Sequence, residues 1–182
     1  MARLPGTERL MSTIIPLAIA VVVGLGSSLQ IALIGGMARA RSAPEATFTS
    51  MMATVAGIGV VLAIRALRGD APAFAAPIDR GLAFLIVAAV AGVLLVLSLK
   101  GLHPGYAITG LFATAFLLGT AFLVPRLGVA LFFAATTAGS LLGALVFDQI
   151  GAFGATPAPL NPQRLLAVIL VFAGVALFRI AR

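Results

Sequence analysis

The sequence predicts an all-α protein, a polytopic bundle of about six transmembrane helices, and three observations support this fold class. The 182 residues are 62% hydrophobic and only 9% charged, whereas soluble domains carry roughly 25% charged residues. The mean hydropathy is +1.19. Apolar runs close to the ~20 residues that span a bilayer recur along the whole chain. We therefore expect one integral membrane domain over residues 1–182.

The apolar runs predict the transmembrane helices in chain order. The predicted spans are residues 14–36, 46–64, 81–99, 105–124, 128–147 and 165–180. The third run, GLAFLIVAAVAGVLLVLSL, is the most uniformly apolar. The last run is short, and it can span if the arginines at its two ends extend toward the lipid headgroups.

The breaks between the runs have the composition of connections. The longest polar segment is RALRGDAPAFAAPIDRG, residues 65–81. In HPG, residues 103–105, Pro104 suits a first helical turn, where its missing N–H has no cost. VPRLG, residues 124–128, predicts a tight turn. Asn161 followed by Pro162 predicts a helix start, with Asn161 as the N-cap.

The distribution of positive charge predicts the orientation. With six spans, eight of the twelve Lys and Arg residues lie on the side of the two termini and four lie on the other side. Because cytoplasmic loops carry the excess of Lys and Arg, both termini are predicted to be cytoplasmic in an inner-membrane, multi-pass protein. The eight are Arg3, Arg9, Arg65, Arg68, Arg80, Arg126, Arg179 and Arg182, and the four are Arg39, Arg41, Lys100 and Arg164.

Small residues at a spacing of four predict close helix packing. GSLLG places Gly139 and Gly143 on one helix face, and GLGSS does the same for Gly24 and Ser28. Such pairs let helix backbones approach each other in lipid. They favour packing within the chain, and a dimer seam is the alternative.

A few polar side chains inside the spans are candidates to line a substrate path, since buried polar groups in a membrane are costly and tend to be functional. The candidates are Gln30, Thr109, Thr136, Thr137 and Ser140. The alternative for the Thr and Ser residues is structural, because their hydroxyls also bond to the carbonyls of their own helix.

Several classes of function are disfavoured by the composition. The chain has no cysteine, and it contains no HExxH motif, paired carboxylates or Ser/His/Asp set, so we expect no enzyme, no metal site and no cofactor. The net charge of +7 comes from arginines between apolar blocks. This pattern indicates contacts with lipid headgroups and no nucleic-acid partner.

The segment from Val124 onward resembles the YdcZ-like small membrane proteins of the drug/metabolite transporter superfamily. The pattern includes a Pro-x-Leu-Gly turn, an Ala-Gly pair on the next helix, an Asp before a GxFG-like turn, and RLL followed by AGV. The matching residues are Pro125, Leu127, Gly128, Ala138, Gly139, Asp148, Gly151, Phe153, Gly154, Arg164, Leu165, Leu166, Ala173, Gly174 and Val175.

The first half of the chain resembles the same family at Gln30. It departs from the family pattern at Ile34, where the family has Asn nearby, and at Ser140, where the family has Gln, so the family's polar residues are not transferred to these positions. Relatives often have five spans, which makes five the alternative to six. The resemblance also implies a homodimer or a heterodimer with a related small membrane protein, parallel or antiparallel.

Asp148 lies one residue beyond the fifth predicted span. It is a candidate for ion coupling or gating. The favoured alternative is that it marks the membrane interface, where its carboxylate accepts bonds from the next turn or pairs with Arg164.

These observations favour a transporter subunit that moves a small organic solute by alternating access, with the first, fourth and fifth helices as the walls of the path. The lack of charge inside the spans favours an apolar or cationic solute over an anion. The alternative function is a non-transporting membrane subunit that stabilises or regulates a partner, which would need no polar-lined cavity.

Overall fold

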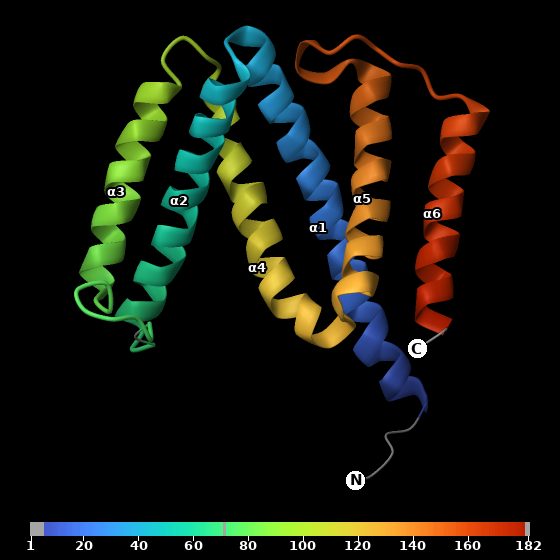
Figure 1. Cartoon of the computed structure of the whole chain (residues 1–182), viewed down its shortest axis with the longest axis horizontal. Coiled ribbons are helices and arrows are strands. Elements are labelled where there is room, and N and C mark those ends of the chain that lie inside the picture. Colours follow the sequence, from blue (N-terminus) through green and yellow to red (C-terminus); the bar gives the residue numbers. More distant parts are fainter. Residues whose placement is uncertain (1–5, 71, 181–182) are drawn as a thin grey trace. The chain divides into compact units, whose positions relative to one another are not determined.

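The computed structural model describes the backbone of residues 6–70 and 72–180 and the side chains of residues 14–70 and 72–180. The described residues form six long α-helices and two short 3-10 helices (Figure 1). Each long helix is apolar and long enough to cross a membrane, which confirms the predicted fold class. The α-helices are α1 (Gly6–Ala40), α2 (Ala43–Leu67), α3 (Gly81–Ser98), α4 (Thr109–Leu127), α5 (Val129–Ile150) and α6 (Pro162–Ile180); the 3-10 helices are η1 (Pro104–Ile108) and η2 (Ala152–Gly154).

Helices are the natural form of these runs, because hydrocarbon offers no partner for free backbone N–H and C=O groups. Several ends are set by local sequence. Ser42 accepts a hydrogen bond from the Glu45 backbone N–H (3.4 Å) at the start of α2 and donates one to the Glu45 carboxylate (2.6 Å), so it acts as the N-cap of this helix. At the start of α6, the Arg164 backbone N–H donates to Asn161 Oδ1 at 2.8 Å, which confirms Asn161 as the predicted N-cap.

The turn predicted at residues 124–128 is shorter in the structure. Helix α4 continues through Pro125 to Leu127, and Gly128 alone separates it from α5. Pro125 has no N–H, so the carbonyl four residues before it lacks its intrahelical partner, and the helix ends two residues later. Gly128 has φ 75°, a conformation that glycine adopts without steric cost.

The chain divides into two compact units. One unit comprises residues 1–32 and 115–182, and the other comprises residues 33–114. Helices α1 and α4 contribute to both. The unit of residues 1–32 and 115–182 is called the cavity unit below, and the unit of residues 33–114 is called the hairpin unit.

In the hairpin unit, α2 and α3 lie side by side in opposite directions (Figure 1). Their contact uses small residues: a Cβ added to Gly59 would lie 3.0 Å from the Cβ of Ala88. The guanidinium of Arg41 donates hydrogen bonds to the carbonyls of Ser98 (2.6 Å) and Lys100 at the end of α3. It thereby satisfies carbonyl groups that the helix end leaves without a partner.

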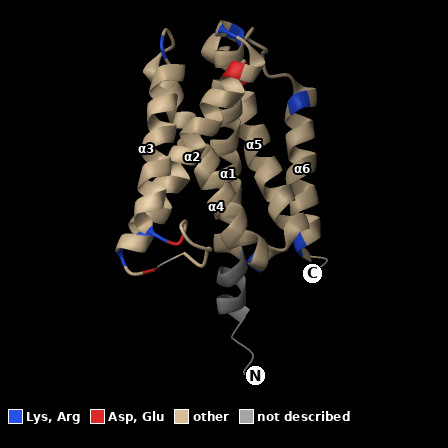
Figure 2. Cartoon of the chain, turned by 60° about the vertical axis from the view of Figure 1, so that its left-hand side comes forward, with Lys and Arg blue, Asp and Glu red and all other residues tan. Residues whose placement is uncertain are grey.

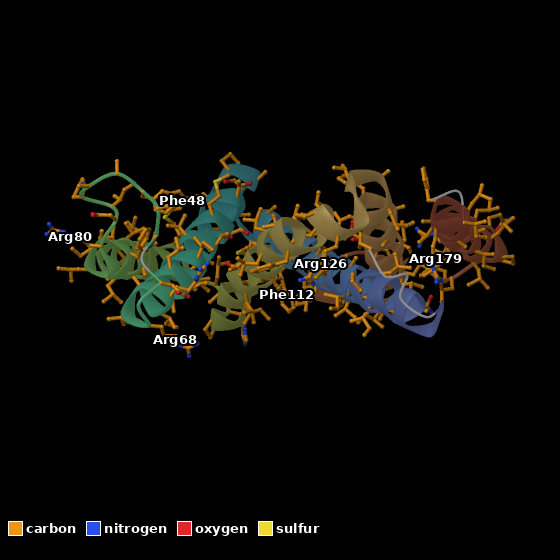
Figure 3. The ribbon with its side chains drawn as sticks, turned by 90° about the horizontal axis from the view of Figure 1, so that it is seen from below. Phe48, Arg68, Arg80, Phe112, Arg126 and Arg179 are labelled. Carbon is orange, nitrogen blue, oxygen red and sulfur yellow. The ribbon has the colours of Figure 1, made fainter. Side chains whose placement is uncertain are left out.

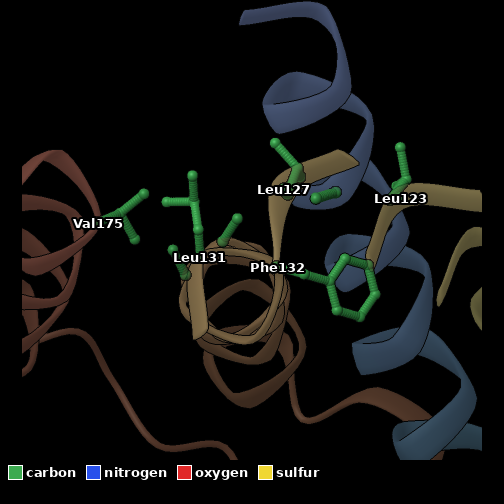
Figure 4. Packing of buried hydrophobic residues seen from close by; sticks show 8 residues of the cluster. Leu123, Leu127, Leu131, Phe132 and Val175 are labelled. Atoms are coloured by element: carbon green, nitrogen blue, oxygen red, sulfur yellow. The ribbon is translucent and has the colours of Figure 1, made fainter. Parts of the chain in front are cut away.

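In the cavity unit, a buried apolar cluster joins α1, α4, α5 and α6 (Figure 4). Phe132 of α5 is 2% exposed, and Val175 points from α6 toward Leu131 of α5. The cluster consists of Ala20, Leu123, Leu127, Leu131, Phe132, Ala135, Ala138 and Val175. Because lipid tails are as apolar as these side chains, the cluster stabilises the unit mainly through close packing.

Charged residues lie at helix ends and in connections throughout the described part of the chain (Figure 2). Arg68 and Arg80, at the two ends of the α2–α3 connection, point away from the helices (Figure 3). Arg3 and Arg182, which contribute to the predicted charge bias, lie outside the described residues, as does the side chain of Arg9.

Candidate functional site: a hydroxyl-lined cavity

A cavity of about 390 Å³ lies between α1, α4 and α5 within the cavity unit. This volume falls in the range of small-molecule sites, ~300–1,000 Å³. Its lining is apolar apart from five hydroxyl groups. The lining residues are Ser27, Ser28 and Ile31 of α1, Phe116 of α4, and Phe133, Thr136, Thr137, Ser140, Leu141 and Ala144 of α5.

Close contact between α1 and α5 forms one wall of the cavity. A Cβ added to Gly139 would overlap the backbone of α1, and a Cβ added to Gly143 would overlap the hydroxyl of Ser28. A Cβ on Gly24 would overlap the carbonyl of Thr136. The four residues that the small-residue spacing singled out therefore meet in a single contact within the chain.

A hydrogen bond between the two helices accompanies this contact. Ser140 Oγ donates to the carbonyl oxygen of Gly24 at 3.0 Å. The glycine brings the α1 backbone close enough for the short serine side chain to reach it. Small residues that allow close packing and hydrogen bonds between helices both favour helix association in lipid.

Two other lining hydroxyls bond to their own helices. Ser28 Oγ donates to the Leu25 carbonyl at 2.7 Å. Thr136 Oγ1 lies 3.0 Å from the carbonyls of both Phe132 and Phe133. These bonds keep the hydroxyls satisfied inside the membrane, and they orient the hydroxyl hydrogens away from any bound molecule.

The structure brings three of the five path candidates together. Thr136, Thr137 and Ser140 lie within two turns of α5 and line the cavity. Gln30 is half-buried on α1 and lies outside the lining. Thr109 belongs to the hairpin unit, where its buried hydroxyl donates to Ser50 Oγ at 2.8 Å.

Sequence reasoning missed the apolar half of the lining. The five apolar lining residues resemble every other apolar residue of their helices, so composition cannot single them out. They are Ile31, Phe116, Phe133, Leu141 and Ala144. The spacing from the polar residues could have identified two of them. Leu141 and Ala144 follow Thr137 by four and seven residues, and this spacing places all three on one helix face.

Asp148 follows Ala144 by one helical turn on the same face of α5. Its carboxylate forms an ion pair with Arg164 at 3.3 Å, and the two side chains are 50% and 37% exposed. The Arg164 guanidinium also donates to the Ala158 carbonyl at 3.3 Å. The carboxylate thus links the last turn of α5 to the first turn of α6 and is absent from the cavity lining.

The electrostatics of the cavity are simple, since none of its ten lining residues is Asp, Glu, Lys, Arg or His. Among residues 6–70 and 72–180, no group of three or more His, Asp or Glu side chains could hold a metal ion. The cavity can therefore recognise a molecule by shape, by aromatic contact and by hydrogen bonds to hydroxyl groups.

Comparison with known proteins identifies the family of this chain. A family model described as "Putative inner membrane exporter, YdcZ" matches residues 15–177, a range that includes most of α1 and of α6 and everything between them. No curated protein and no solved structure matches the chain. The match supports a membrane transporter rather than an enzyme. Since it covers most of the chain, this protein belongs to the YdcZ family, within the drug/metabolite transporter group.

Proposed function

We propose that this protein exports a small organic solute by alternating access and that the solute binds in the cavity between α1, α4 and α5. The observation that carries the proposal is the cavity itself: five hydroxyls line a space of about 390 Å³ between apolar helices, open on the side of Ile31 and Phe133. Polar groups are costly in the middle of a membrane and are commonly part of a substrate path.

The same observation favours a transporter over a non-transporting subunit. A subunit that only stabilises or regulates a partner needs a packing face and no polar-lined space. Here the small-residue face is already engaged between α1 and α5, and the hydroxyls surround an open volume. Both features support a role in moving a solute.

The proposal includes a dimer, because a chain of six helices resembles half of a transporter whose two packed halves alternate. The partner is a second copy or a related small membrane protein. Both termini are proposed to be cytoplasmic, in line with the excess of Lys and Arg on their side. Consistent with this, α1 begins and α6 ends at the same end of the cavity unit (Figure 1).

Filling the cavity tests the proposal. Cells with and without the protein would be loaded with a panel of small organic compounds, and the loss of each compound from the cells would be followed by mass spectrometry. We expect the protein to accelerate the loss of at least one compound. Thr137→Trp is expected to abolish this effect, since Thr137 is an exposed side chain of the lining.

Val146→Trp is the matched control. Val146 lies on the same helix, is 58% exposed and is absent from the lining, so the same bulky substitution there is expected to leave efflux unchanged. Efflux that survives Thr137→Trp at the wild-type rate, with both variants present in the membrane at equal amounts, would contradict the proposed site.

A further inference from the structure

The hydroxyl groups of the cavity differ in how their hydrogens are used. A hydroxyl has one hydrogen to donate and two lone pairs that accept. Ser28, Thr136 and Ser140 each donate to a backbone carbonyl of α1 or α5, at 2.7 to 3.0 Å. Their hydrogens are therefore occupied, and only their lone pairs are left for a bound molecule.

Ser27 and Thr137 supply the remaining two hydroxyls. Within the part of the chain that the structure describes, neither side chain has a hydrogen-bond partner in the protein, so each can donate or accept. The cavity thus offers five hydroxyl oxygens as acceptors and only two hydroxyl hydrogens as donors. Its polar lining is biased toward accepting hydrogen bonds.

The rest of the lining reinforces this bias. No basic side chain lines the cavity, so a carboxylate or phosphate would find only two free hydroxyl hydrogens in place of its hydration. No acidic side chain lines it either, but the N–H groups of an amine would find five hydroxyl oxygens that can accept them. Phe116 and Phe133 add aromatic rings. The face of such a ring attracts a cation.

We infer that the cavity selects a small organic amine whose N–H groups donate to the lone pairs of Thr136, Ser140 and their neighbouring hydroxyls. This inference rests on the proposed function, because it names the class of solute for the same site. Recognition by positive charge alone would treat a primary amine and a quaternary ammonium alike. Recognition through N–H donors predicts that a quaternary ammonium with the same carbon skeleton binds more weakly than the primary amine.

Three probes with one phenylethyl-type body separate the possibilities. They are 2-phenylethylamine, its N,N,N-trimethyl derivative, which keeps the charge and loses the N–H donors, and 3-phenylpropionate, which reverses the charge. Binding of each would be measured on the purified, full-length protein in lipid nanodiscs by isothermal titration calorimetry. We expect the primary amine to bind best, the trimethyl derivative more weakly and the carboxylate not at all.

A matched pair of variants tests the role of the lone pairs. Thr136→Val keeps the shape of the side chain and removes the acceptor, so it should weaken binding of the primary amine about tenfold, the loss of one hydrogen bond to a charged group. It should leave binding of the trimethyl derivative unchanged. Thr120→Val is the control: Thr120 also donates to the carbonyl four residues earlier, at 2.8 Å to Phe116, and lies outside the lining.

The outcomes separate the inference from the proposed function. Equal binding of the amine and its trimethyl derivative, a preference for the carboxylate, absence of binding by all three probes, or equal losses in the Thr136 and Thr120 variants would each overturn the inference. Binding of the amine that is sensitive to Thr136→Val, together with no movement of the amine across a vesicle membrane, would support the inference and contradict the proposed export.

Discussion

The contact between α1 and α5 depends on the absence of a Cβ atom at three glycine positions. Gly24, Gly139 and Gly143 leave no room for a Cβ, because backbone or hydroxyl atoms of the facing helix occupy that space. Other glycines in the same kind of helix have no such constraint. Gly174 of α6 has no atom within 4 Å of an added Cβ. A glycine in this chain is therefore essential or replaceable according to what faces it.

Gly139→Ala is expected to lower the free energy of unfolding by about 1–3 kcal/mol, the usual cost of forcing an extra group into a packed site. Gly174→Ala is the control and is expected to be neutral or stabilising by up to about 1 kcal/mol, since alanine is the better helix former. Thermal unfolding of the two purified variants in detergent checks this. Equal stability of the two variants would show that α1 and α5 do not approach as closely as described.

At the scale of elements, the α5–α6 connection is fastened by several contacts of modest strength. The Ala158 backbone N–H donates to the Asp148 carbonyl at 2.8 Å, and the Leu160 backbone N–H donates to Gln149 Oε1 at 2.6 Å. The ion pair of Asp148 with Arg164 adds to these bonds. The pairing of Asp148 with Arg164 is the one that the interface alternative expects, and we predict a structural role for this carboxylate.

Asp148→Asn and Arg164→Gln are each expected to cost less than about 1 kcal/mol of stability, because partly exposed ion pairs contribute little. Both variants should retain efflux of any compound found to be exported. Efflux from vesicles containing each variant provides the measurement. Loss of efflux in Asp148→Asn alone would instead assign the carboxylate to ion coupling or gating.

At the scale of the whole molecule, the number of spans and their orientation determine which connections face the cytoplasm. With six spans and cytoplasmic termini, the α2–α3 connection is cytoplasmic and the α5–α6 connection is external. The absence of cysteine makes this topology simple to test, since any introduced cysteine is the only thiol in the chain.

In intact spheroplasts, a membrane-impermeant maleimide is expected to label Thr156→Cys, in the exposed α5–α6 connection, and to spare Ala75→Cys, in the exposed α2–α3 connection. Both should be labelled after the membrane is opened. Labelling of both cysteines in intact spheroplasts would indicate insertion in two orientations and an antiparallel homodimer, and the reverse pattern would place the termini outside.

The sequence by itself determined the class, the six helices and several of their ends. These features depend on local chemistry: a long apolar run must form a helix in hydrocarbon, and a residue such as Asn161 caps the helix that follows it. The same reasoning identified Thr136, Thr137 and Ser140 as path candidates because polar side chains stand out in an apolar helix.

Only the tertiary structure decided which helix faces meet. In the tertiary structure, Thr109 donates a hydrogen bond to Ser50 and is not part of the cavity. Gln30 lies outside the cavity lining, whereas Phe116 and Ile31 belong to the lining. The physical reason is that in lipid every apolar face is equally satisfied. The pairing of faces then depends on steric fit between residues far apart in the chain, such as Gly24 and Thr136, and no local pattern encodes that fit.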